Sequence, residues 1–232
     1  MTIRSSVLIF TLCFFQLGLQ AQHSLGFRIG AASAGVKAPD ALSALTGRFD
    51  KLTAWDIALF SELKIAPNFS IQPELAYAQK GFVIDETRDL NLFDIPLPLG
   101  VRSVTQINYV EMPLLAKLSF GHHKVSGFVG IGPNISYALD GKLKARARVI
   151  LDIPITNTDI DLDQIGYNRF EAGGIITAGV AVDTGNGKFF IDARYKRGFT
   201  DTYTVPVVDL EVRNSSFGMN IGYAFKLTGN RY

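Results

Sequence analysis

Cysteine, histidine and tryptophan are scarce in this chain of 232 residues, which contains one cysteine, three histidines and one tryptophan. The single cysteine, Cys13, lies in an apolar run near the N-terminus, so disulfides cannot hold the remainder of the chain together. Charge is sparse as well, because only 19% of the residues are charged and the net charge is +2. Nucleic-acid binding relies on an excess of basic groups that neutralise phosphates, so we expect no nucleic-acid partner.

Long apolar runs are absent beyond the first 21 residues, and none approaches the roughly 20 residues that a membrane helix needs. The first residues follow the layout of a secretory signal peptide, with a positive start at Arg4, an apolar run over Val7–Leu19 and a small residue at Ala21. We predict cleavage after Ala21, so that residues 1–21 are the signal peptide and residues 22–232 form one domain. The alternative is an uncleaved membrane anchor, but the apolar run Val7–Leu19 is short for a helix that spans a bilayer.

Motifs of catalysis are also missing. The chain has no Gly-x-Ser-x-Gly elbow, no phosphate-binding loop and no His-Glu-x-x-His sequence. His122 and His123 are adjacent in a predicted tight turn, where solvated side chains are the usual outcome, and His23 follows the predicted cleavage point. We therefore predict that the protein is not an enzyme and has no catalytic residues and no cofactor.

One spacing invites a calcium interpretation. Asp159, Asp161 and Asp163 alternate as the first ligands of an EF-hand loop do. However, Gln164 occupies the position that requires glycine, and Phe170 occupies the position that requires glutamate. We expect no metal site.

What the sequence does contain is an alternation with a period of two, seen most clearly over Ser216–Leu227. Large apolar residues alternate there with small or polar ones, as in Phe217-Gly218-Met219-Asn220-Ile221-Gly222. Successive side chains of a strand point to opposite faces, so one face is bulky and apolar and the other is small and polar. This arrangement is typical of a narrow barrel that stands in lipid with its polar face inward.

Seven further segments make eight predicted strands, which are Leu25–Ala32, Ala54–Ile65, Phe69–Lys80, Val104–Phe120, Lys124–Tyr137, Phe170–Val182, Lys188–Phe199 and Ser216–Leu227. Tight turns alternate with long loops, which are predicted at 33–53, 81–103, 138–169 and 200–213. The predicted fold is therefore an all-β, eight-stranded antiparallel up-and-down transmembrane β-barrel with short periplasmic turns and long extracellular loops. An even number of strands places both termini in the periplasm and the barrel in a bacterial outer membrane.

Aromatic residues gather near both ends of these strands, as the two membrane interfaces favour. The turn-side level comprises Phe69, Phe120, Phe189 and Phe225, and the loop-side level comprises Trp55, Tyr77, Tyr137, Phe170, Phe199 and Phe217. A soluble barrel with an aromatic core is the alternative.

The inward face carries six acids and six bases, so we expect its charges to cancel. An eight-stranded barrel is only wide enough for its own side chains, and buried charges must be paired. We predict a packed polar plug, with a narrow ion path as the alternative, and Gly218 and Gly222 are expected to leave room for Arg194 and Lys196. The predicted interior network comprises Arg28, Asp56, Glu62, Lys64, Glu74, Lys80, Tyr109, Glu111, Lys117, Glu171, Asp192, Arg194 and Lys196.

The long loops supply two further candidates. Prolines among aliphatic residues in three loops predict an apolar surface that either packs on itself or docks a partner, formed by Ile95, Leu97, Leu99, Ile153, Ile155, Val205 and Val207. In the loop at 138–169, a basic row of Lys142, Lys144, Arg146 and Arg148 is expected to fold against an acidic row of Asp159, Asp161 and Asp163. The basic row either forms a solvated ladder of ion pairs or contacts lipopolysaccharide phosphates.

The segment Tyr109–Lys117 resembles the Tyr-x-Glu-x-Pro-Leu-Leu-x-Lys stretch of the PorT-like outer-membrane β-barrels of Bacteroidota, and Ile71–Leu75 and Gly130–Pro133 agree with it. The closing Gly222–Phe225 is similar to the strand that the barrel-assembly machinery reads, although residues 228–232 extend beyond it. The resemblance implies an outer-membrane barrel and a link to secretion or envelope assembly.

Three functions follow as hypotheses. The first is a non-enzymatic barrel with a plugged polar interior that acts as a scaffold or docking protein through its extracellular loops. The second is a small channel or transporter for ions or small solutes. The third is a soluble secreted ligand-binding barrel. The expected partners are outer-membrane lipid and lipopolysaccharide, the barrel-assembly machinery during insertion, and an envelope protein that meets the loops.

Overall fold

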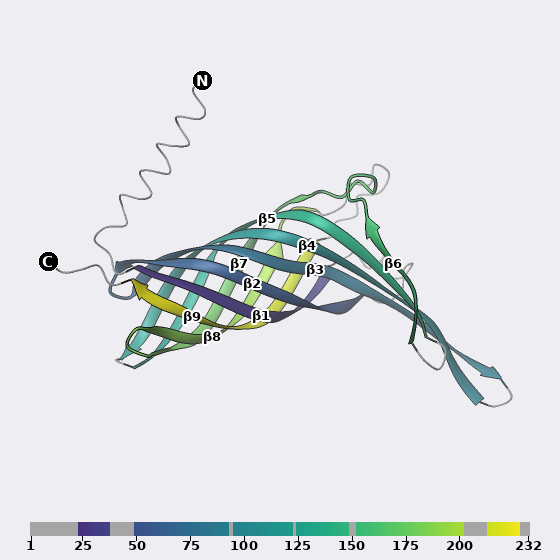
Figure 1. Ribbon diagram of the computed structural model, residues 1–232, viewed down its shortest axis with the longest axis horizontal. Helices are drawn as coiled ribbons and strands as arrows, with labels where there is room; N and C mark the ends of the chain where they lie inside the picture. The colour runs from purple at the N-terminus through teal and green to yellow at the C-terminus, as the bar shows by residue number, and fades with distance from the viewer. Residues whose placement is uncertain are drawn as a thin grey trace, which may run out of the picture.

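The computed structural model describes residues 23–37, 49–92, 95–122, 124–148, 152–201 and 213–227. Strands dominate these residues (Figure 1). They are β1 (His23–Lys37), β2 (Phe49–Ala66), β3 (Phe69–Leu92), β4 (Ile95–His122), β5 (Val125–Arg148), β6 (Asp152–Ile160), β7 (Phe170–Asp183), β8 (Gly187–Gly198) and β9 (Arg213–Leu227). The signal peptide predicted for residues 1–21 lies outside the described residues. Among the described residues there is no helix with the length and apolar character that crossing a bilayer requires.

Eight of these strands close into a ring. Each pairs antiparallel with its neighbours in the order β1-β2-β3-β4-β5-β7-β8-β9, and β9 returns to β1. Closure pairs the backbone groups that an open edge would leave exposed, which a strand in hydrocarbon requires. The predicted eight-stranded antiparallel barrel is confirmed.

The strands are longer than the sequence predicted. β3 and β4 remain paired as far as Leu92 and Ile95, and β5 continues to Arg148, where β6 pairs with its outer part. The predicted loop at 81–103 is therefore wrong, and so is part of the loop at 138–169, because both segments form paired strands. Pairing satisfies their backbone N–H and C=O groups, so their polar and proline-rich composition was misleading.

The two ends of the barrel differ. Short turns lie at the end where β1 begins and β9 finishes, and the β3–β4 hairpin projects from the other end (Figure 1). In one short turn, Gly185 has a φ of 90°, and its N–H donates to Asp183 Oδ1 at 2.8 Å. Glycine suits this left-handed backbone because it has no Cβ.

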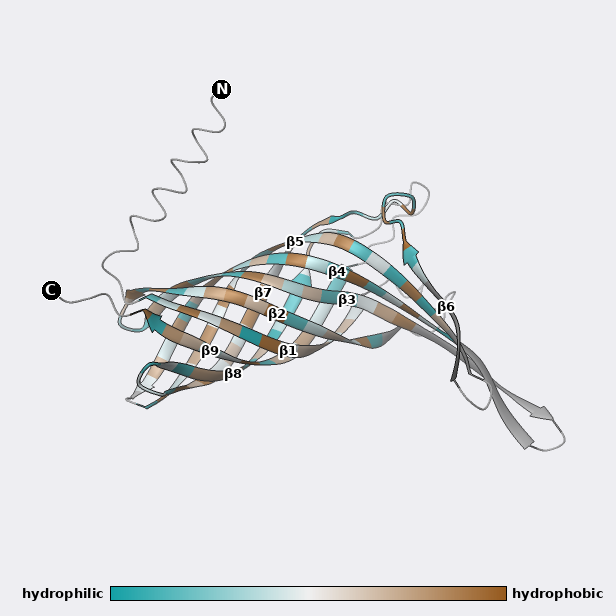
Figure 2. Ribbon diagram, in the orientation of Figure 1, coloured by the Kyte–Doolittle hydropathy of each residue, from teal (hydrophilic) through white to brown (hydrophobic). Residues whose placement is uncertain are grey.

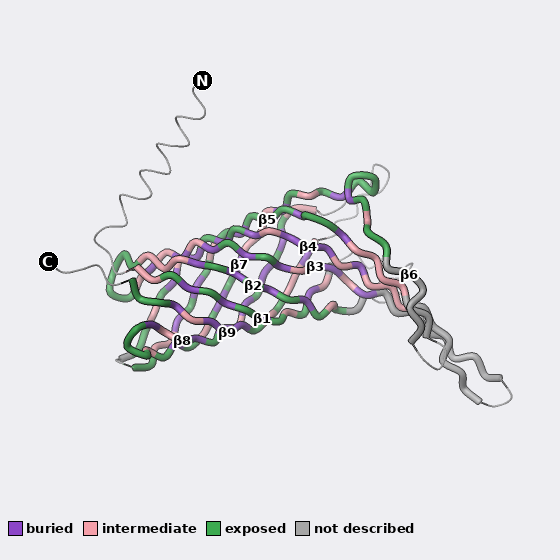
Figure 3. The backbone as a smooth tube through the Cα atoms, in the orientation of Figure 1, coloured by how far each residue is buried: buried purple, intermediate pink, exposed green. Residues whose placement is uncertain are grey.

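Burial alternates along every strand of the ring, as the tube in Figure 3 shows. In β9, Phe217 and Ile221 are 55% and 49% exposed, whereas Asn220 and Ala224 are 4% and 3% exposed. The apolar side chains thus face outward and many polar ones face inward, and Figure 2 shows the same alternation as changing colours along the strands. This is the reverse of a soluble domain and matches a barrel in lipid.

Candidate functional site

The centre of the barrel holds an arginine cluster assembled from strands far apart in sequence. Arg28 of β1 donates to Asp56 Oδ1 of β2 at 2.7 Å and to Glu74 Oε2 of β3 at 3.1 Å. Arg194 of β8 reaches the same Glu74 at 2.8 Å and also donates to Asp192 Oδ1 at 3.1 Å. All five side chains are buried. Two guanidinium groups therefore share three carboxylates, as buried charges require.

Toward the hairpin end, two lysines continue the network. Lys196 Nζ contacts Glu111 Oε2 at 2.7 Å and also donates to Asp56. Lys80 Nζ lies 2.9 Å from Glu111 Oε1 and 2.7 Å from Glu171 Oε1. Asp56 thus joins the lysines to the arginine cluster, and Glu111 joins the two lysines to each other.

Toward the turn end, the polar network ends at Lys117. Its Nζ donates to Glu62 Oε2 at 2.9 Å and to Gln72 Oε1 at 3.2 Å. Gln72 in turn donates to Glu74 at 2.7 Å, which connects Lys117 to the arginine cluster. The ammonium also lies 4.3 Å from the centroid of the Phe128 ring, a cation–π distance.

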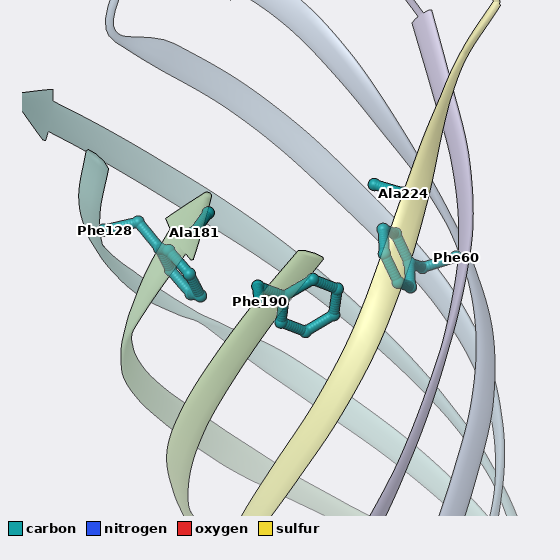
Figure 4. Close-up of a cluster of buried hydrophobic side chains, with 5 residues drawn as sticks. All are labelled: Phe60, Phe128, Ala181, Phe190 and Ala224. Carbon is teal, nitrogen blue, oxygen red and sulfur yellow. The ribbon is translucent and has the colours of Figure 1, made fainter. Parts of the chain in front are cut away.

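An apolar cluster lies toward the turn end of the interior, and it was not predicted from the sequence. Phe60, Phe128 and Phe190 pack together there with Ala181 and Ala224 (Figure 4). The Phe190 ring meets those of Phe60 and Phe128 edge to face, at centroid distances of 5.6 and 6.2 Å. The signal in the sequence is that these phenylalanines occupy inward positions of the period-two alternation.

Gly222 leaves room for this aromatic layer rather than for the charged side chains. A Cβ at Gly222 would lie 2.4 Å from Phe190 Cζ, and a Cβ at Gly218 would lie 2.9 Å from the backbone O of Ala31. The prediction that both glycines make room for Arg194 and Lys196 is therefore wrong, because Gly222 lies against Phe190 and Gly218 lies against the backbone of β1. The space at Gly222 is taken by a phenyl ring from the neighbouring strand.

The other end of the interior is covered by the segment between β6 and β7. Leu162 and Tyr167 of this segment are buried against Ile107, Tyr109 and Ala138. The hydroxyl groups of Tyr109 and Tyr167 form a hydrogen bond, and Asn214 Nδ2 donates to Glu171 Oε2 at 2.6 Å just beneath. The lid, as we call residues 161–169, therefore lies directly on the polar network.

An ion pair holds the lid. Arg169 donates to Asp163 through Nε at 2.8 Å and through Nη2 at 2.9 Å, and its Nη1 donates to the carbonyl of Leu139 at 3.0 Å. The hydrogen bonds from Arg169 lower the pKa of the Asp163 carboxyl below its usual range. The same contacts raise the pKa of Arg169.

Twelve of the thirteen predicted interior residues face the inside, and Lys64 differs because it is exposed near the turn end. Without Lys64, the charged members of the network that the structure describes are six acids and five bases. The acids are Asp56, Glu62, Glu74, Glu111, Glu171 and Asp192, and the bases are Arg28, Lys80, Lys117, Arg194 and Lys196. The expected exact balance of charge is not found.

Among the described residues, a pocket between Lys80, Asn134, Glu171, Lys196 and Asn214 has a volume of about 10 Å³, about what a single water molecule needs. The arrangement can fix the barrel's shape through ion pairs that join strands far apart in the ring. The packed polar plug stays a prediction.

Above the barrel, β5 and β6 bring only part of the basic and acidic rows together. Lys142 lies opposite Asp159 in the register. Asp161 and Asp163 instead lie in the lid, where Asp161 Oδ1 accepts from the backbone N–H of Asp163 at 3.1 Å. The expected acidic row therefore ends at Asp159, because the chain turns there. Within the described ranges, no three His, Cys, Asp or Glu side chains come together as a metal site would need.

The predicted apolar loop surface is not placed by the structure. Val205 and Val207 lie outside the described residues, and the side chains of Ile95, Leu97, Leu99, Ile153 and Ile155 are outside the described part as well. The backbones of these five residues belong to β4 and β6.

A family model described as the outer membrane protein β-barrel domain matches residues 16–204. The chain belongs to this family of outer-membrane β-barrels. The barrel and its apolar outer surface thus stand in outer-membrane lipid, and the soluble secreted alternative is wrong. No curated protein matches the sequence.

Solved structures of other outer-membrane proteins resemble this barrel. Ail, the attachment invasion locus protein of Yersinia pestis, is 15% identical, with a TM-score of 0.43 over 88% of this chain and 99% of Ail. Neisserial surface protein A is 10% identical, with a TM-score of 0.39 over 85% of this chain and 95% of that protein. The protease OmpT of Escherichia coli is 8% identical, with a TM-score of 0.33 over 89% of this chain and 94% of OmpT. With TM-scores below 0.5, these likenesses carry no argument about function.

Proposed function

We propose that this outer-membrane barrel is a non-enzymatic docking protein whose interior is closed and whose extramembrane sheet meets a partner in the cell envelope. The observation that carries the proposal is the contrast between its two parts. Inside the ring, charged and aromatic side chains pack against one another from the lid to the phenylalanine layer. Beyond the ring, β3, β4, β5 and β6 remain paired and present a sheet rather than separate loops.

The orientation is part of the proposal. With short turns and both strand termini at one end, that end faces the periplasm and the paired extension faces the outside, as in other outer-membrane barrels. The backbones of Leu97 in β4 and Ile155 in β6 then lie outside the membrane. The PorT-like motif at Tyr109–Lys117 supports a role linked to secretion or envelope assembly, with insertion by the barrel-assembly machinery.

A small channel is the second candidate function, and one observation favours it. Hydrogen bonds and ion pairs run without a break from Tyr109 to Lys117 through Asn214, Glu171, Lys80, Glu111, Lys196, Asp56, Arg28, Glu74 and Gln72. However, a solute needs open volume, and the groups of this chain occupy one another's hydrogen-bonding positions. Docking is therefore the better supported function.

The docking proposal is tested by shortening the extension. Residues 85–102 are replaced by Asn-Gly, which suits a two-residue hairpin between Ile84 and Ser103, a directly opposed pair. A photo-crosslinking amino acid is placed at Phe82 in the full-length and the shortened protein, and at Asn68 in a turn at the other end as the matched control. Heat-modifiable gel mobility checks that each variant is folded.

We expect a discrete envelope-protein crosslink from Phe82 that disappears when the extension is shortened. Crosslinks from Asn68 are expected to be the same in both proteins. Equal crosslinking from Phe82 with and without residues 85–102 would show that the extension does not dock the partner.

A further inference from the structure

The outer surface of β1 carries a groove of about 250 Å³ on the side of the barrel that faces lipid. Its outward-facing residues are Ile29, Ala31, Trp55, Ile191, Met219 and Ile221. The register explains the groove, because Ala31 lies opposite Trp55 of β2 on one side and opposite Met219 of β9 on the other. Trp55 and Met219 are 56% and 57% exposed, and their large side chains flank the small side chain of Ala31.

The groove ends in polar groups on the hairpin side. The next outward pair along the strands is Ser33 and Thr53, which lie opposite each other and are both exposed. One step further, a Cβ at Gly35 would lie 3.6 Å from Cγ of the exposed Lys51. On this outward face, the apolar groove is thus followed along β1 and β2 by Ser33, Thr53 and Lys51.

We propose that this groove binds one acyl chain of a membrane lipid whose phosphate-bearing headgroup lies beside Ser33, Thr53 and Lys51. The groove is continuous with the apolar surface that the bilayer covers, so a lipid chain is the occupant already in contact with it. Tryptophan favours the membrane interface, which puts Trp55 at the depth where chains meet headgroups. A lysine near the membrane surface attracts anionic lipid. In the proposed orientation, the lipid belongs to the outer leaflet.

Trp55 is the one tryptophan of the chain, so its fluorescence reports on this groove without labelling. The folded protein is reconstituted in phosphatidylcholine vesicles that contain increasing fractions of brominated phosphatidylglycerol or brominated phosphatidylcholine. Bromine quenches tryptophan on contact. We expect brominated phosphatidylglycerol to quench Trp55 at lower mole fraction than brominated phosphatidylcholine. The expected ratio is about fivefold, which corresponds to about 1 kcal/mol for one lysine near the membrane surface.

Two variants separate the chain from the headgroup. Ala31→Leu fills the groove, and we expect it to reduce quenching of Trp55 to the level that random contact with bulk lipid produces. Lys51→Gln is expected to remove the preference for phosphatidylglycerol while leaving chain contact. Ala178→Leu is the matched control, because Ala178 is an exposed, outward alanine of β7, and it should behave as the original protein does.

Two results would overturn the proposal. One is quenching in the original protein that follows bulk composition for both lipids and does not change with Ala31→Leu. The other is protection of Trp55 that grows with the ratio of protein to lipid, because a second copy of the chain would then cover the groove. Either result leaves the docking role of the extension untouched, since that role rests on other residues.

Discussion

Lys196 Nζ of β8 lies 2.7 Å from Glu111 Oε2 of β4, although these two strands are not neighbours in the ring. The same ammonium donates to Asp56 of β2. One lysine thus ties three strands together across the inside of the barrel. Contacts of this kind resist changes of the barrel's cross-section that backbone pairing alone permits.

Lys196→Met tests this crosslink. The change leaves Asp56 and Glu111 each without one buried partner, and breaking a buried ion pair costs about 3–5 kcal/mol. We expect the free energy of unfolding to fall by this order, measured by urea titration in lipid vesicles with Trp55 fluorescence. Lys64→Met is the matched control, because Lys64 is exposed, and it should change stability by less than about 0.5 kcal/mol. Equal losses in the two variants would refute a special role for Lys196.

Phe190→Ala tests the aromatic layer at the turn end. Truncating a buried phenylalanine costs about 3–5 kcal/mol in packed cores, and the Phe60 and Phe128 rings lose their common contact here. Phe189→Ala, which changes the outward neighbour on the same strand, should cost less because lipid fills the space that it leaves. The same urea titration measures both variants. If Phe189→Ala proves the more damaging, the inward layer does not stabilise the barrel as described.

A double-mutant cycle of Tyr109→Phe and Tyr167→Phe tests how the lid is held. The two hydroxyl groups bond to each other, so the single changes should not add up. We expect a coupling free energy of about 0.5–1.5 kcal/mol, the net contribution of a typical hydrogen bond. Strictly additive effects would show that the lid does not depend on this bond.

The ion pair of Asp163 and Arg169 gives the lid a pH dependence. Because the pKa of Asp163 is lowered in the folded protein, its contribution is present above the ordinary carboxyl pKa of about 3.9 and is lost as the pH falls through the lower, folded value. The backbone N–H signal of Gly166 in NMR spectra should therefore titrate below about 3.9. In Arg169→Gln, the midpoint should return toward that ordinary value. A midpoint that is the same in both proteins contradicts the assigned cause.

The sequence predicted the ring and most of its interior because a period of two records which face each residue takes. The phenylalanine layer was not predicted, because the adjacent Phe189 and Phe190 are the same residue type and only the register shows that Phe190 faces inward. The sequence misplaced Lys64 because alternation gives the face of a residue but not its depth. The paired extension at 81–103 was also missed, because charge and proline there resemble a loop, whereas strand pairing depends on what lies opposite.

Single-channel recording in planar lipid bilayers tests the closed interior most directly. The purified barrel and the variant without residues 85–102 should both pass no steady current, because the ion pairs that close the interior lie within the ring. Discrete current steps of constant size from the folded, unaltered protein would contradict the account and favour a channel.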